Sequence, residues 1–454
     1  MKLEVVILAA GQGTRMRSAL PKVLHPLAGK ALVHHVIDTA TALDAKAIHT
    51  VIGHGAERVQ QQLAALPTGW ALQEQQLGTG HAVAQAMPKV ADDSIVLVLY
   101  GDVPLVKAAT LQKLLTAVDA NNMALLTVEL NDPTGYGRIL RDAKGSVTAI
   151  VEQKDATPEQ LKIREGNTGI LAAKASLLKK WLPQLSANNA QGEYYLTDII
   201  GLAVQQGIGV NAQQAPAAWE VQGINNRLQL SELERIHQRN IAEQLMTDGV
   251  TLADPARIDV RGTLTVGRDI FIDVNCVFEG DVTLGDNVRI GPNCVIRNAR
   301  IAANAEIESH TLIDEAVLGV DTHVGPFARL RPGTELAAKA KVGNFVETKK
   351  TYIGVGSKAN HLTYLGDCVI GENANVGAGT ITCNYDGVNK SKTTIGDGAF
   401  IGSNSSLVAP VNIGKNATVG AGSVITADIP DNELAVARGK QRNIAGWRRP
   451  MKKQ

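Results

Sequence analysis

An excess of charge of one sign is absent from this sequence of 454 residues, in which 45 Lys and Arg face 44 Asp and Glu for a formal net charge of +1. Nucleic acids and anionic membrane surfaces attract proteins that carry a strong basic excess. The balance therefore gives no general reason to expect either of them, and we expect no nucleic-acid partner.

Long hydrophobic runs are also missing. The apolar run near the start of the chain covers only Val5–Ala10 and ends at Gly11. A membrane-spanning helix needs about 20 apolar residues, and an export signal needs a longer apolar stretch followed by a cleavage site. We therefore expect no membrane span and a cytoplasmic location, with the run forming a buried strand.

Cysteine and aromatic residues are scarce. The four cysteines have no C-x-x-C spacing, and all of them lie in the second half of the chain (Cys276, Cys294, Cys368 and Cys383). Without an export signal, free thiols are their expected state. Aromatic residues make up 4% of the chain, whereas it has 44 glycines, so many tight corners and few large core anchors are expected.

What the chain does have, up to about residue 225, is an alternation of strand-like and helix-like segments. The strand-like runs are EVVILAAG, AIHTVIGH, SIVLVLYGD and NMALLTVEL, separated by segments such as VHHVIDTATAL. This alternation is typical of an α/β domain with a mostly parallel sheet covered on both faces. In such sheets ligands bind beyond the carboxyl ends of the strands.

Residues 226–248 have a different character. They contain no Gly or Pro, and they place Leu233, Ile236, Ile241 and Leu245 near helical spacing. This pattern predicts a single connecting helix.

After Pro255 an apolar residue recurs every six positions. The recurring residues are Val266, Ile272, Phe278, Leu284, Ile290 and Ile296, then Val324, Leu330, Leu336 and Val342, and finally Ile395, Ile401, Leu407, Ile413, Val419 and Ile425. A short fixed period of this kind predicts a parallel β-helix, in which three hexads make one coil. The segment CNYDGVNKSKT, residues 383–393, does not fit the hexads and is expected to loop out.

The segment LAAGQGTRM, residues 8–16, ends the first strand-like run in a glycine-rich turn. Glycine allows positive φ and close backbone approach, so the N–H groups of such a turn can face phosphate oxygens. No Gly-Lys-Ser/Thr follows, which excludes a P-loop, and Met16 stands where a dinucleotide fingerprint needs a third glycine. From this turn alone, a structural turn and a phosphate loop both stay open.

Nearby residues favour the phosphate loop. Arg15 and Lys22 supply cations for a triphosphate. Asp102 lies just past the end of the apolar run LVLY, where a carboxylate suits Mg²⁺, an ion that takes one or two protein oxygens together with phosphates and waters. The alternative is a turn-forming Asp before Pro104.

Eight segments carry a resemblance to a known family: LAAGQGTRM, LPKVL, QLGTGHA, YGDVPL, PTGYGRI, IVEQKD, NTGI and GINNRL. They are similar to those of the sugar-nucleotide pyrophosphorylases, and the whole chain resembles the bacterial bifunctional N-acetylglucosamine-1-phosphate uridyltransferases / glucosamine-1-phosphate acetyltransferases. The resemblance implies a Rossmann-like nucleotidyltransferase domain over 1–225, a linker helix over 226–248, and a left-handed parallel β-helix of hexapeptide repeats over 249–454. It also implies a homotrimer, Mg²⁺ as cofactor, and UTP and acetyl-CoA as co-substrates.

The resemblance further implies the residues of a uridyltransferase site. It places Gly11, Arg15 and Lys22 on the UTP phosphates, Gln73, Gly78 and Thr79 on the uracil, Tyr100, Gly101 and Asp102 on the uridyl group, and Gly137, Glu152, Asn167 and Asn225 on N-acetylglucosamine 1-phosphate. Asp102 and Asn225 are the implied Mg²⁺ ligands.

An acetyltransferase site is implied in the β-helix. The resemblance places Arg331, Lys349, Tyr364 and Asn375 on glucosamine 1-phosphate, and Ala378, Asn384, Tyr385, Ser403, Ala421 and Arg438 on acetyl-CoA, with the basic tail reaching its phosphates. His361 is the implied catalytic base, since a base with a pKa near neutrality is suited to deprotonating the amino group of the sugar. Glu347, the nearest preceding carboxylate, is expected to orient the imidazole of His361. A solvated corner of the solenoid is the alternative for His361, and RNA binding is the alternative for the tail.

Two other functions are compatible with such modules. One is a single-activity sugar-1-phosphate nucleotidyltransferase whose β-helix is structural or regulatory, and it predicts hexads without the histidine, lysine and arginine set. The other is a non-enzymatic binding protein, which predicts loss of Lys22, Asp102 or Asn225. All of these residues are present.

Overall fold

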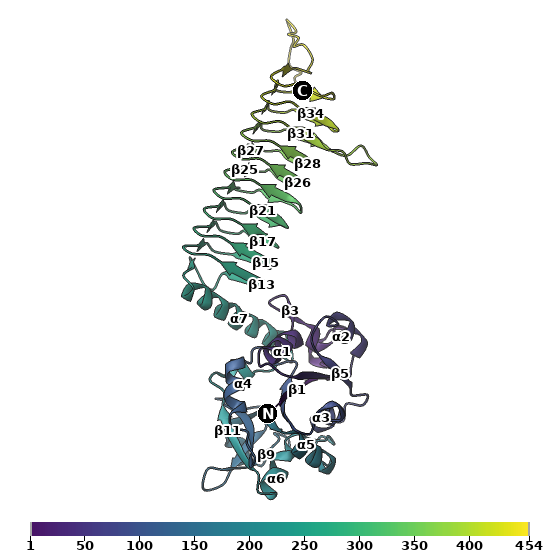
Figure 1. Ribbon diagram of the computed structural model, residues 1–454, viewed down its shortest axis with the longest axis vertical. Helices are drawn as coiled ribbons and strands as arrows, with labels where there is room; N and C mark the ends of the chain where they lie inside the picture. The colour runs from purple at the N-terminus through teal and green to yellow at the C-terminus, as the bar shows by residue number, and fades with distance from the viewer. Residues whose placement is uncertain (1, 453–454) are drawn as a thin grey trace. The chain divides into compact units, whose positions relative to one another are not determined.

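The computed structural model describes residues 2–452, which form two compact units that meet in the sequence between His237 and Gln238. Unit 1, the N-terminal unit, is an α/β domain, and unit 2, the C-terminal unit, is a long β-helix (Figure 1). The α/β class and the β-helix predicted from the sequence are both confirmed. In the part of the chain that the structure describes, no helix is long and apolar enough to cross a membrane.

Unit 1 is built on a nine-stranded sheet. Its main strands follow the order β11 (Gly209–Gln214), β7 (Asn122–Glu129), β10 (Glu165–Lys174), β6 (Ser94–Tyr100), β1 (Lys2–Ala9), β4 (Ala47–Ile52) and β5 (Gly69–Leu72), and β10 also pairs with β8 (Arg138–Arg141), which pairs with β9 (Val147–Val151). The short strands β2 (Pro26–Leu27) and β3 (Lys30–Ala31) form a separate hairpin.

The pairing in this sheet is mostly parallel, with one interruption. β1 is parallel to β4 and β6, β4 to β5, and β7 to β11. β10 runs antiparallel to both of its neighbours, β6 and β7. A continuous apolar run does not encode strand direction, so this reversal could not be predicted from the sequence.

Both faces of the sheet are buried, because successive side chains of a strand point to opposite faces. In β1, Val5 and Ile7 belong to one apolar cluster, and Val6 and Leu8 belong to the other. The first cluster is covered by α1 (Leu32–Thr41), α2 (Ala56–Gln62) and α4 (Ala108–Leu115), and the second by α3 (Thr79–Ala86), α5 (Ala175–Trp181) and α6 (Asp198–Gln205). Continuous apolar strands are therefore explained by two-sided burial.

Helix α7 (Arg227–Thr247) occupies the segment for which a connecting helix is predicted. Leu233 of this helix is buried in a cluster of unit 1, whereas Ala242 and Leu245 are buried in the core of unit 2. The boundary between the compact units thus lies inside the helix rather than at either end of it.

Unit 2 coils into a left-handed parallel β-helix. One face is an eleven-stranded sheet of β12 (Thr251–Leu252), β14 (Phe271–Ile272), β16 (Arg289–Ile290), β19 (Glu306–Ile307), β22 (His323–Val324), β25 (Lys341–Asn344), β27 (Lys358–His361), β29 (Asn375–Val376), β32 (Phe400–Ile401), β35 (Thr418–Val419) and β37 (Leu434–Ala435). Arg289 pairs with Phe271 of the coil before it and with Glu306 of the coil after it. One coil is therefore 17 or 18 residues long, which is three hexads.

The other two faces share a fifteen-stranded sheet. Its strands are β13 (Ile258–Val266), β15 (Cys276–Leu284), β17 (Val295–Arg297), β18 (Arg300–Ile301), β20 (Leu312–Asp314), β21 (Ala316–Leu318), β23 (Arg329–Leu330), β24 (Thr334–Leu336), β26 (Glu347–Ile353), β28 (Tyr364–Ile370), β30 (Ile381–Cys383), β31 (Thr393–Ile395), β33 (Ser406–Val408), β34 (Val411–Ile413) and β36 (Val424–Ile425). The predicted loop lies between β30 and β31.

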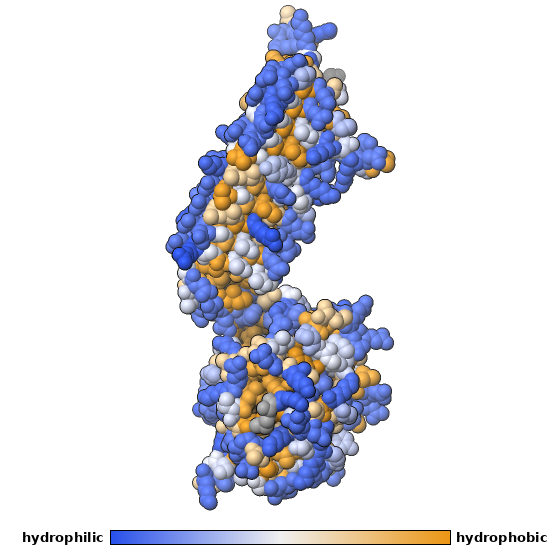
Figure 2. All heavy atoms as spheres, in the orientation of Figure 1, coloured by the Kyte–Doolittle hydropathy of each residue, from blue (hydrophilic) through white to orange (hydrophobic). Residues whose placement is uncertain are grey.

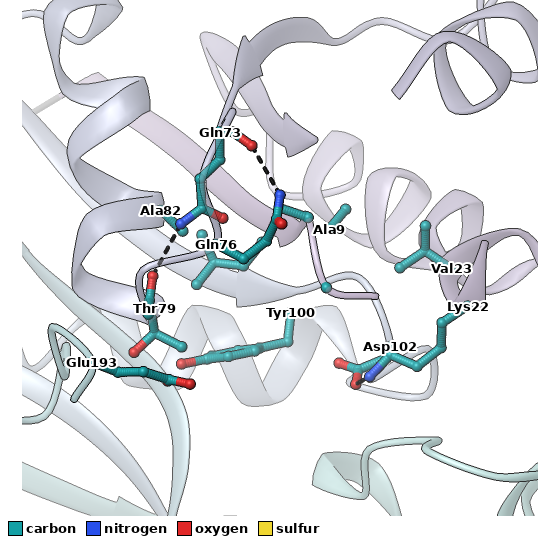
Figure 3. Close-up of a pocket in the computed structure, with 14 residues that line it drawn as sticks. Ala9, Lys22, Val23, Gln73, Gln76, Thr79, Ala82, Tyr100, Asp102 and Glu193 are labelled. Carbon is teal, nitrogen blue, oxygen red and sulfur yellow. Dashed lines mark hydrogen bonds and ion pairs between the residues drawn. The ribbon is translucent and has the colours of Figure 1, made fainter. Parts of the chain in front are cut away.

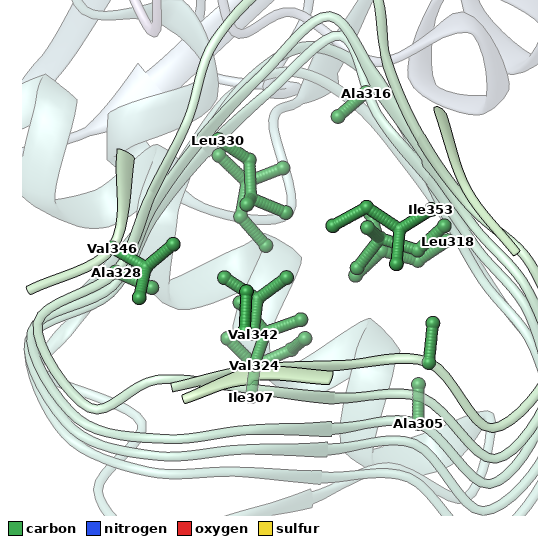
Figure 4. Close-up of a cluster of buried hydrophobic side chains, with 14 of the residues drawn as sticks. Ala305, Ile307, Ala316, Leu318, Val324, Ala328, Leu330, Val342, Val346 and Ile353 are labelled. Atoms are coloured by element: carbon green, nitrogen blue, oxygen red, sulfur yellow. The ribbon is translucent and has the colours of Figure 1, made fainter. Parts of the chain in front are cut away.

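The hexad residues fill the interior of the β-helix. Figure 4 shows Ile307, Val324 and Val342 stacked one above another inside the coil, with Leu330 and Ile353 pointing inward from the other faces. Of the sixteen positions that define the predicted period, only Val266 is less than fully buried, and it still packs against this core. The period is therefore confirmed as the repeat of the core.

Candidate active sites

The glycine-rich turn lies at the edge where β1 and β6 end. Both strands run in the same direction, with Leu8 opposite Tyr100, so the turn after β1 and Asp102 after β6 emerge side by side. Gly13 has φ +63°, and a Cβ atom there would lie 2.5 Å from Cβ of Lys22. Only glycine fits this close approach, and the approach brings Lys22 against the turn.

A cavity of about 250 Å³ opens at this edge of the sheet (Figure 3). Seven of the nine residues expected to contact the uridyl nucleotide line it: Gly11, Lys22, Gln73, Gly78, Thr79, Tyr100 and Asp102. The other two are Arg15, which joins the site through a hydrogen bond, and Gly101, which lies between Tyr100 and Asp102 and donates its N–H to the Leu8 carbonyl. The structure thus brings the whole predicted set together.

One wall of the cavity holds an amide in a fixed orientation. Gln73 is buried, and its Nε2 donates to the carbonyl of Gly78 at 3.1 Å. Gly78 has φ +112°, and a Cβ atom there would meet the Tyr194 carbonyl oxygen at 2.7 Å, so a larger residue would displace the wall. A buried amide fixed in this way is suited to reading the hydrogen-bonding edge of a base.

Asp102, Asn225 and Lys22 form the polar centre of the site. Lys22 Nζ donates to Oδ2 of Asp102, an ion pair drawn in Figure 3, and to Oδ1 of Asn225 at 3.2 Å. Asn225 Oδ1 also accepts from Arg15 Nη2 at 2.9 Å. Asp102 does stand in a turn, because the Val103 N–H bonds to the Tyr100 carbonyl, but its carboxylate bonds Lys22 rather than capping the turn.

This centre fits Mg²⁺. The oxygens of Asp102 and Asn225 both bond the same ammonium group, so they converge on one point. Carboxylate and amide oxygens are hard donors of the kind that Mg²⁺ prefers, and two protein ligands leave room for phosphate oxygens and water.

Of the residues expected to bind the amino sugar, Gly137 and Asn167 lie around Glu152, whereas Asn225 belongs to the polar centre described above. A Cβ atom on Gly137 would approach Oε1 of Glu152 to 3.3 Å, and the Asn167 N–H donates to the Gly137 carbonyl at 2.8 Å. The hydroxyl of Thr197 donates to Glu152 Oε1 at 3.1 Å. Burial raises the pKa of the Glu152 carboxyl, and the Thr197 hydrogen bond opposes that rise.

Tyr100 links the two halves of this site. Burial, followed by the nearby negative charges of Glu152 and Asp102, raises the pKa of its phenol far above the ordinary value. Gly169 leaves the space that the ring occupies, since a Cβ atom there would lie 2.6 Å from the phenol oxygen. Tyr100 therefore stays neutral between the carboxylates expected to contact the metal and the sugar.

Sequence reasoning missed several residues of this cavity. Gln76 and Glu193 line it, and Thr197 fixes Glu152. Gln76 is the first residue of the recognised segment QLGTGHA and could have been found there. Glu193 and Thr197 come from a segment whose position beside α3 depends on tertiary contacts, such as the bond from the Tyr194 N–H to the Leu77 carbonyl.

In unit 2, cationic and polar residues gather along one face of the β-helix. Arg331 Nη1 donates to Glu347 Oε1 at 2.7 Å, and Tyr364 is the register partner of Glu347 in the next coil. The ammonium of Lys349 lies beside that of Lys390 from the inserted loop, and this like charge lowers the pKa of Lys349. Three cations close together are suited to a phosphate dianion.

His361 has a different orienting partner from the one expected. Its Nδ1 lies 2.7 Å from Oδ1 of Asn344, and Asn344 is its register partner in the preceding coil. Glu347 instead bonds Arg331, so the prediction that Glu347 orients His361 is wrong. The coil step explains the error, because the residue that stacks on Glu347 is Tyr364 rather than His361.

The backbone atoms expected to hold acetyl-CoA follow one corner of the β-helix upward from His361. The Gly379 N–H donates to the His361 carbonyl, the next two steps repeat this backbone pattern, and a side chain makes the last bond. The steps are Asn404 N–H to the Ala378 carbonyl at 2.8 Å, Gly422 N–H to the Ser403 carbonyl at 2.8 Å, and Arg438 Nη1 to the Ala421 carbonyl at 2.6 Å. Ala378, Ser403 and Ala421 are therefore successive members of one corner.

The remaining expected residues separate into two places. Asn384 is buried at the base of the inserted loop, where its Nδ2 donates to Asp367 Oδ2 at 2.5 Å, and Tyr385 is exposed in the loop itself. Asn375 lies in β29, in register with Lys358 on the eleven-stranded face. Within one chain Asn375 is thus on a different face from Arg331 and Tyr364.

Fold and sites together define a class, a nucleotidyltransferase joined to a hexapeptide-repeat β-helix. Residues 5–175 match the family of MobA-like NTP transferase domains, residues 260–353 match the GMPPB C-terminal domain, and residues 392–427 match the hexapeptide repeat of succinyl-transferase. The first match confirms the nucleotidyltransferase domain predicted for unit 1, and the last confirms the hexapeptide repeats predicted for unit 2.

Full-length relatives identify the family. The chain is 65% identical over 450 residues to the bifunctional protein GlmU of Marinobacter nauticus, with 99% of each chain covered. It is 61% identical over 451 residues to that of Cellvibrio japonicus, with 99% of this chain and 100% of the relative covered, and 61% identical over 454 residues to that of Idiomarina loihiensis, with all of both covered. The chain belongs to the GlmU family of bifunctional proteins, and the resemblance carried by the sequence motifs is confirmed.

Proposed function

We propose that this chain makes UDP-N-acetylglucosamine in two steps, acetylating glucosamine 1-phosphate with acetyl-CoA and then transferring UMP from UTP to the product, with release of pyrophosphate. The observation that carries the proposal is the presence of two separate sites of different chemistry. Unit 1 has a cavity lined by Lys22 and by carboxylate and amide oxygens, whereas unit 2 has an oriented histidine and a cluster of cations on the next face of the β-helix. A single-activity enzyme with a structural β-helix has no use for the second site.

In the first site, Arg15, Lys22 and the N–H groups around Gly11 bind the UTP phosphates, while Gln73, Gly78 and Thr79 hold the uracil. Glu152, Asn167, Gly137 and Asn225 hold the sugar phosphate so that its oxygen faces the α-phosphorus in line. Mg²⁺ bound by Asp102 and Asn225 would neutralise charge on the phosphates. Positioning and charge neutralisation then suffice without a covalent enzyme intermediate, and each 1.4 kcal/mol or so of stabilisation gives a tenfold rate.

In the second site, His361 acts as general base on the amino group of glucosamine 1-phosphate. Oδ1 of Asn344 can only accept a hydrogen bond, so Nδ1 of His361 carries the proton and Nε2 has the free lone pair. Arg331 and Lys349 bind the phosphate, and Tyr364 contacts the sugar. A positioned base of this kind contributes about 10²- to 10⁴-fold to the rate.

Acetyl-CoA lies along the corner that continues from His361, with its thioester beside the backbone of Ala378, Ser403 and Ala421. Asn384 and Tyr385 of the inserted loop complete the binding site, and Arg438 with the basic tail binds the CoA phosphates. The small residues at these positions support the proposal, because they let a long ligand lie against the β-helix.

The active assembly is a homotrimer in which neighbouring β-helices complete each acetyl-transfer site. Two observations support this. His361 and Asn375 belong to strands of the eleven-stranded face, whereas Tyr364 begins a strand of the fifteen-stranded sheet, and a site between neighbouring chains would bring these faces together. Apolar residues are also exposed on the β-helix (Figure 2), among them Phe327 and Phe345, whose rings stack with centroids 5.3 Å apart.

We assign uridyl transfer to residues 1–225 and acetyl transfer to residues 249–454, with residues 226–248 as the connecting helix. A cytoplasmic location fits both the substrates and the four cysteines, all of which are free thiols, three of them buried.

One assay tests both activities. The full chain is incubated with glucosamine 1-phosphate, acetyl-CoA, UTP and Mg²⁺, and free thiol and pyrophosphate are followed separately. Wild type should release both, whereas His361→Ala should release neither unless N-acetylglucosamine 1-phosphate is supplied, which restores pyrophosphate alone. Unchanged thiol release in His361→Ala would exclude it as the base.

A further inference from the structure

The ammonium group of Lys22 occupies the place between the two oxygens that fit a metal ion. It bonds Oδ2 of Asp102 and Oδ1 of Asn225 at once, and the side chains of Lys22 and Asp102 are only 14% and 16% exposed. Arg15 bonds the same oxygen of Asn225. In the chain without nucleotide, both oxygens therefore already accept hydrogen bonds from side-chain cations.

We infer that Lys22 is a placeholder cation, which holds Asp102 and Asn225 together until a metal ion replaces it. The inference rests on the proposed uridyltransferase site. An ammonium and a divalent cation cannot share the same two oxygens, because they occupy one volume and repel each other. Metal binding to the free protein therefore requires Lys22 to withdraw.

A bound triphosphate would offer the Lys22 ammonium alternative oxygens to bond. Gly13 packs directly against the Lys22 side chain, and the N–H groups of its turn would face the phosphates. Only the end of the Lys22 side chain therefore has to move to reach them. Once Lys22 and Arg15 bond phosphate oxygens, Asp102 and Asn225 become available to the metal. Metal and nucleotide then bind cooperatively, and by linkage each raises the affinity of the other by the same factor, typically about 5- to 150-fold.

The test measures Mn²⁺ binding to the full chain, with the electron paramagnetic resonance signal of free Mn²⁺ as readout. In unit 2, Glu306, Glu308 and His323 place one ligand atom each within 4.8 Å of one another and could also hold Mn²⁺. All proteins compared therefore carry Glu306→Gln and Glu308→Gln. Asp102→Asn in this background identifies the Mn²⁺ that binds in unit 1.

Without nucleotide, Lys22→Met should bind Mn²⁺ about tenfold or more tightly than the parent. Arg15→Gln is the matched control, because it removes one positive charge from the same site but leaves Lys22 on Asp102, and its gain should be several-fold smaller. Lys22→Gln serves as a second variant if Lys22→Met unfolds. A UTP analogue with a methylene between the α- and β-phosphorus should tighten Mn²⁺ binding in the parent, and the enhancement should be mostly lost in Lys22→Met.

Three results would overturn the inference. Equal Mn²⁺ affinity in the parent and Lys22→Met rejects the placeholder while leaving the proposed function intact, provided that Asp102→Asn still weakens binding. Equal gains in Mn²⁺ affinity in Lys22→Met and Arg15→Gln would mean that Lys22 acts only through its positive charge and not by occupying the metal position. Mn²⁺ binding that does not depend on Asp102 rejects the metal site itself, and with it both the inference and that part of the proposed function.

Discussion

Oδ1 of Asn344 and Nδ1 of His361 are 2.7 Å apart, one coil from each other on the same corner of the β-helix. An imidazole with a single hydrogen bond on Nδ1 is held in one ring orientation and one tautomer. Among the described residues, Asn344 is hydrogen-bonded to none of those proposed to bind the sugar phosphate. It is a positioning residue, and its contribution should be visible in the rate rather than in substrate binding.

Asn344→Ala should therefore lower kcat for acetyl transfer about tenfold, equivalent to about 1.4 kcal/mol, with KM for glucosamine 1-phosphate almost unchanged. Asn344→Asp should retain more activity but shift the acidic limb of its pH profile upward, because a carboxylate raises the pKa of a neighbouring imidazole. Thiol release followed from pH 5.5 to 9 gives both quantities. Asn287→Ala, which removes a similar bond between coils at 3.1 Å, is the control and should leave the profile in place.

Glu347→Gln should behave in the opposite way. Glu347 bonds Arg331 rather than His361, so the variant leaves the acidic limb of the pH profile where it is. Arg331 loses a charged partner that fixes its guanidinium, and KM for glucosamine 1-phosphate should change several-fold. Initial rates of thiol release at varied sugar phosphate measure this. A shifted pH profile with constant KM would return Glu347 to the role of orienting His361.

The features of the fold and the sites that depend on residues close together in the chain could be predicted from the sequence. The hexad positions face the core because the coil itself has that period, and the motif residues of unit 1 meet because parallel strands end at one edge. Asn344 was missed because its partner is a coil away, whereas Glu347 was chosen as the nearest carboxylate in the chain. Counting one coil of 17 residues back from His361 leads to Asn344, and this register exists only once the coils are stacked.

The possible metal-binding cluster that contains Glu306 and His323 was missed for the same reason, because the two residues pair across neighbouring coils. No spacing in the sequence marks it as a ligand set. Glu193 is a similar case in unit 1, where it reaches the nucleotide cavity only through the packing of its segment beside α3. The segments that form the sites could thus be predicted from the sequence, whereas the contacts between segments could not.

Asp102→Ala should abolish uridyl transfer and leave acetyl transfer within about twofold of wild type. Asp102 is the only carboxylate that bonds Lys22 among the described residues, and it belongs to unit 1, whereas the His361 corner belongs to unit 2. Pyrophosphate and thiol release from the same preparation measure the two activities. Loss of both in a variant with an unchanged circular dichroism spectrum would contradict separate sites.

Phe327 and Phe345 should contribute to assembly rather than to the fold of one chain. Their side chains are 47% and 55% exposed, and their φ angles are 56° each, a conformation that is strained for bulky residues. Asn tolerates this conformation, so Phe327→Asn with Phe345→Asn should preserve the monomer. The proposed trimer should dissociate in this variant at a protein concentration about tenfold or more above that of wild type, as measured by mass photometry of the 48.0 kDa chain. Leu228→Asn, at an exposed position in α7, is the control.

Glu152 should make the stability of unit 1 depend on pH. Burial raises the pKa of its carboxyl above the ordinary 4.5; the Thr197 bond opposes this, and Asp155, Asp198 and Glu193 add to the rise. The folded chain thus binds this proton more tightly than the unfolded chain, so the ionised group lowers stability above the raised pKa, and this cost disappears as the pH falls towards 4.5.

Glu152→Gln retains an oxygen acceptor for Thr197 and removes the charge. Its Tm should exceed that of wild type by a few degrees at pH 7.5, and the difference should shrink steadily towards pH 4.5. Differential scanning calorimetry of both proteins across this range gives the difference, in which the other titrating groups cancel. Glu159→Gln, whose carboxylate is 81% exposed, should show no such slope. A Tm difference that is constant or grows on acidification would mean that Glu152 is ionised at little cost in the folded protein.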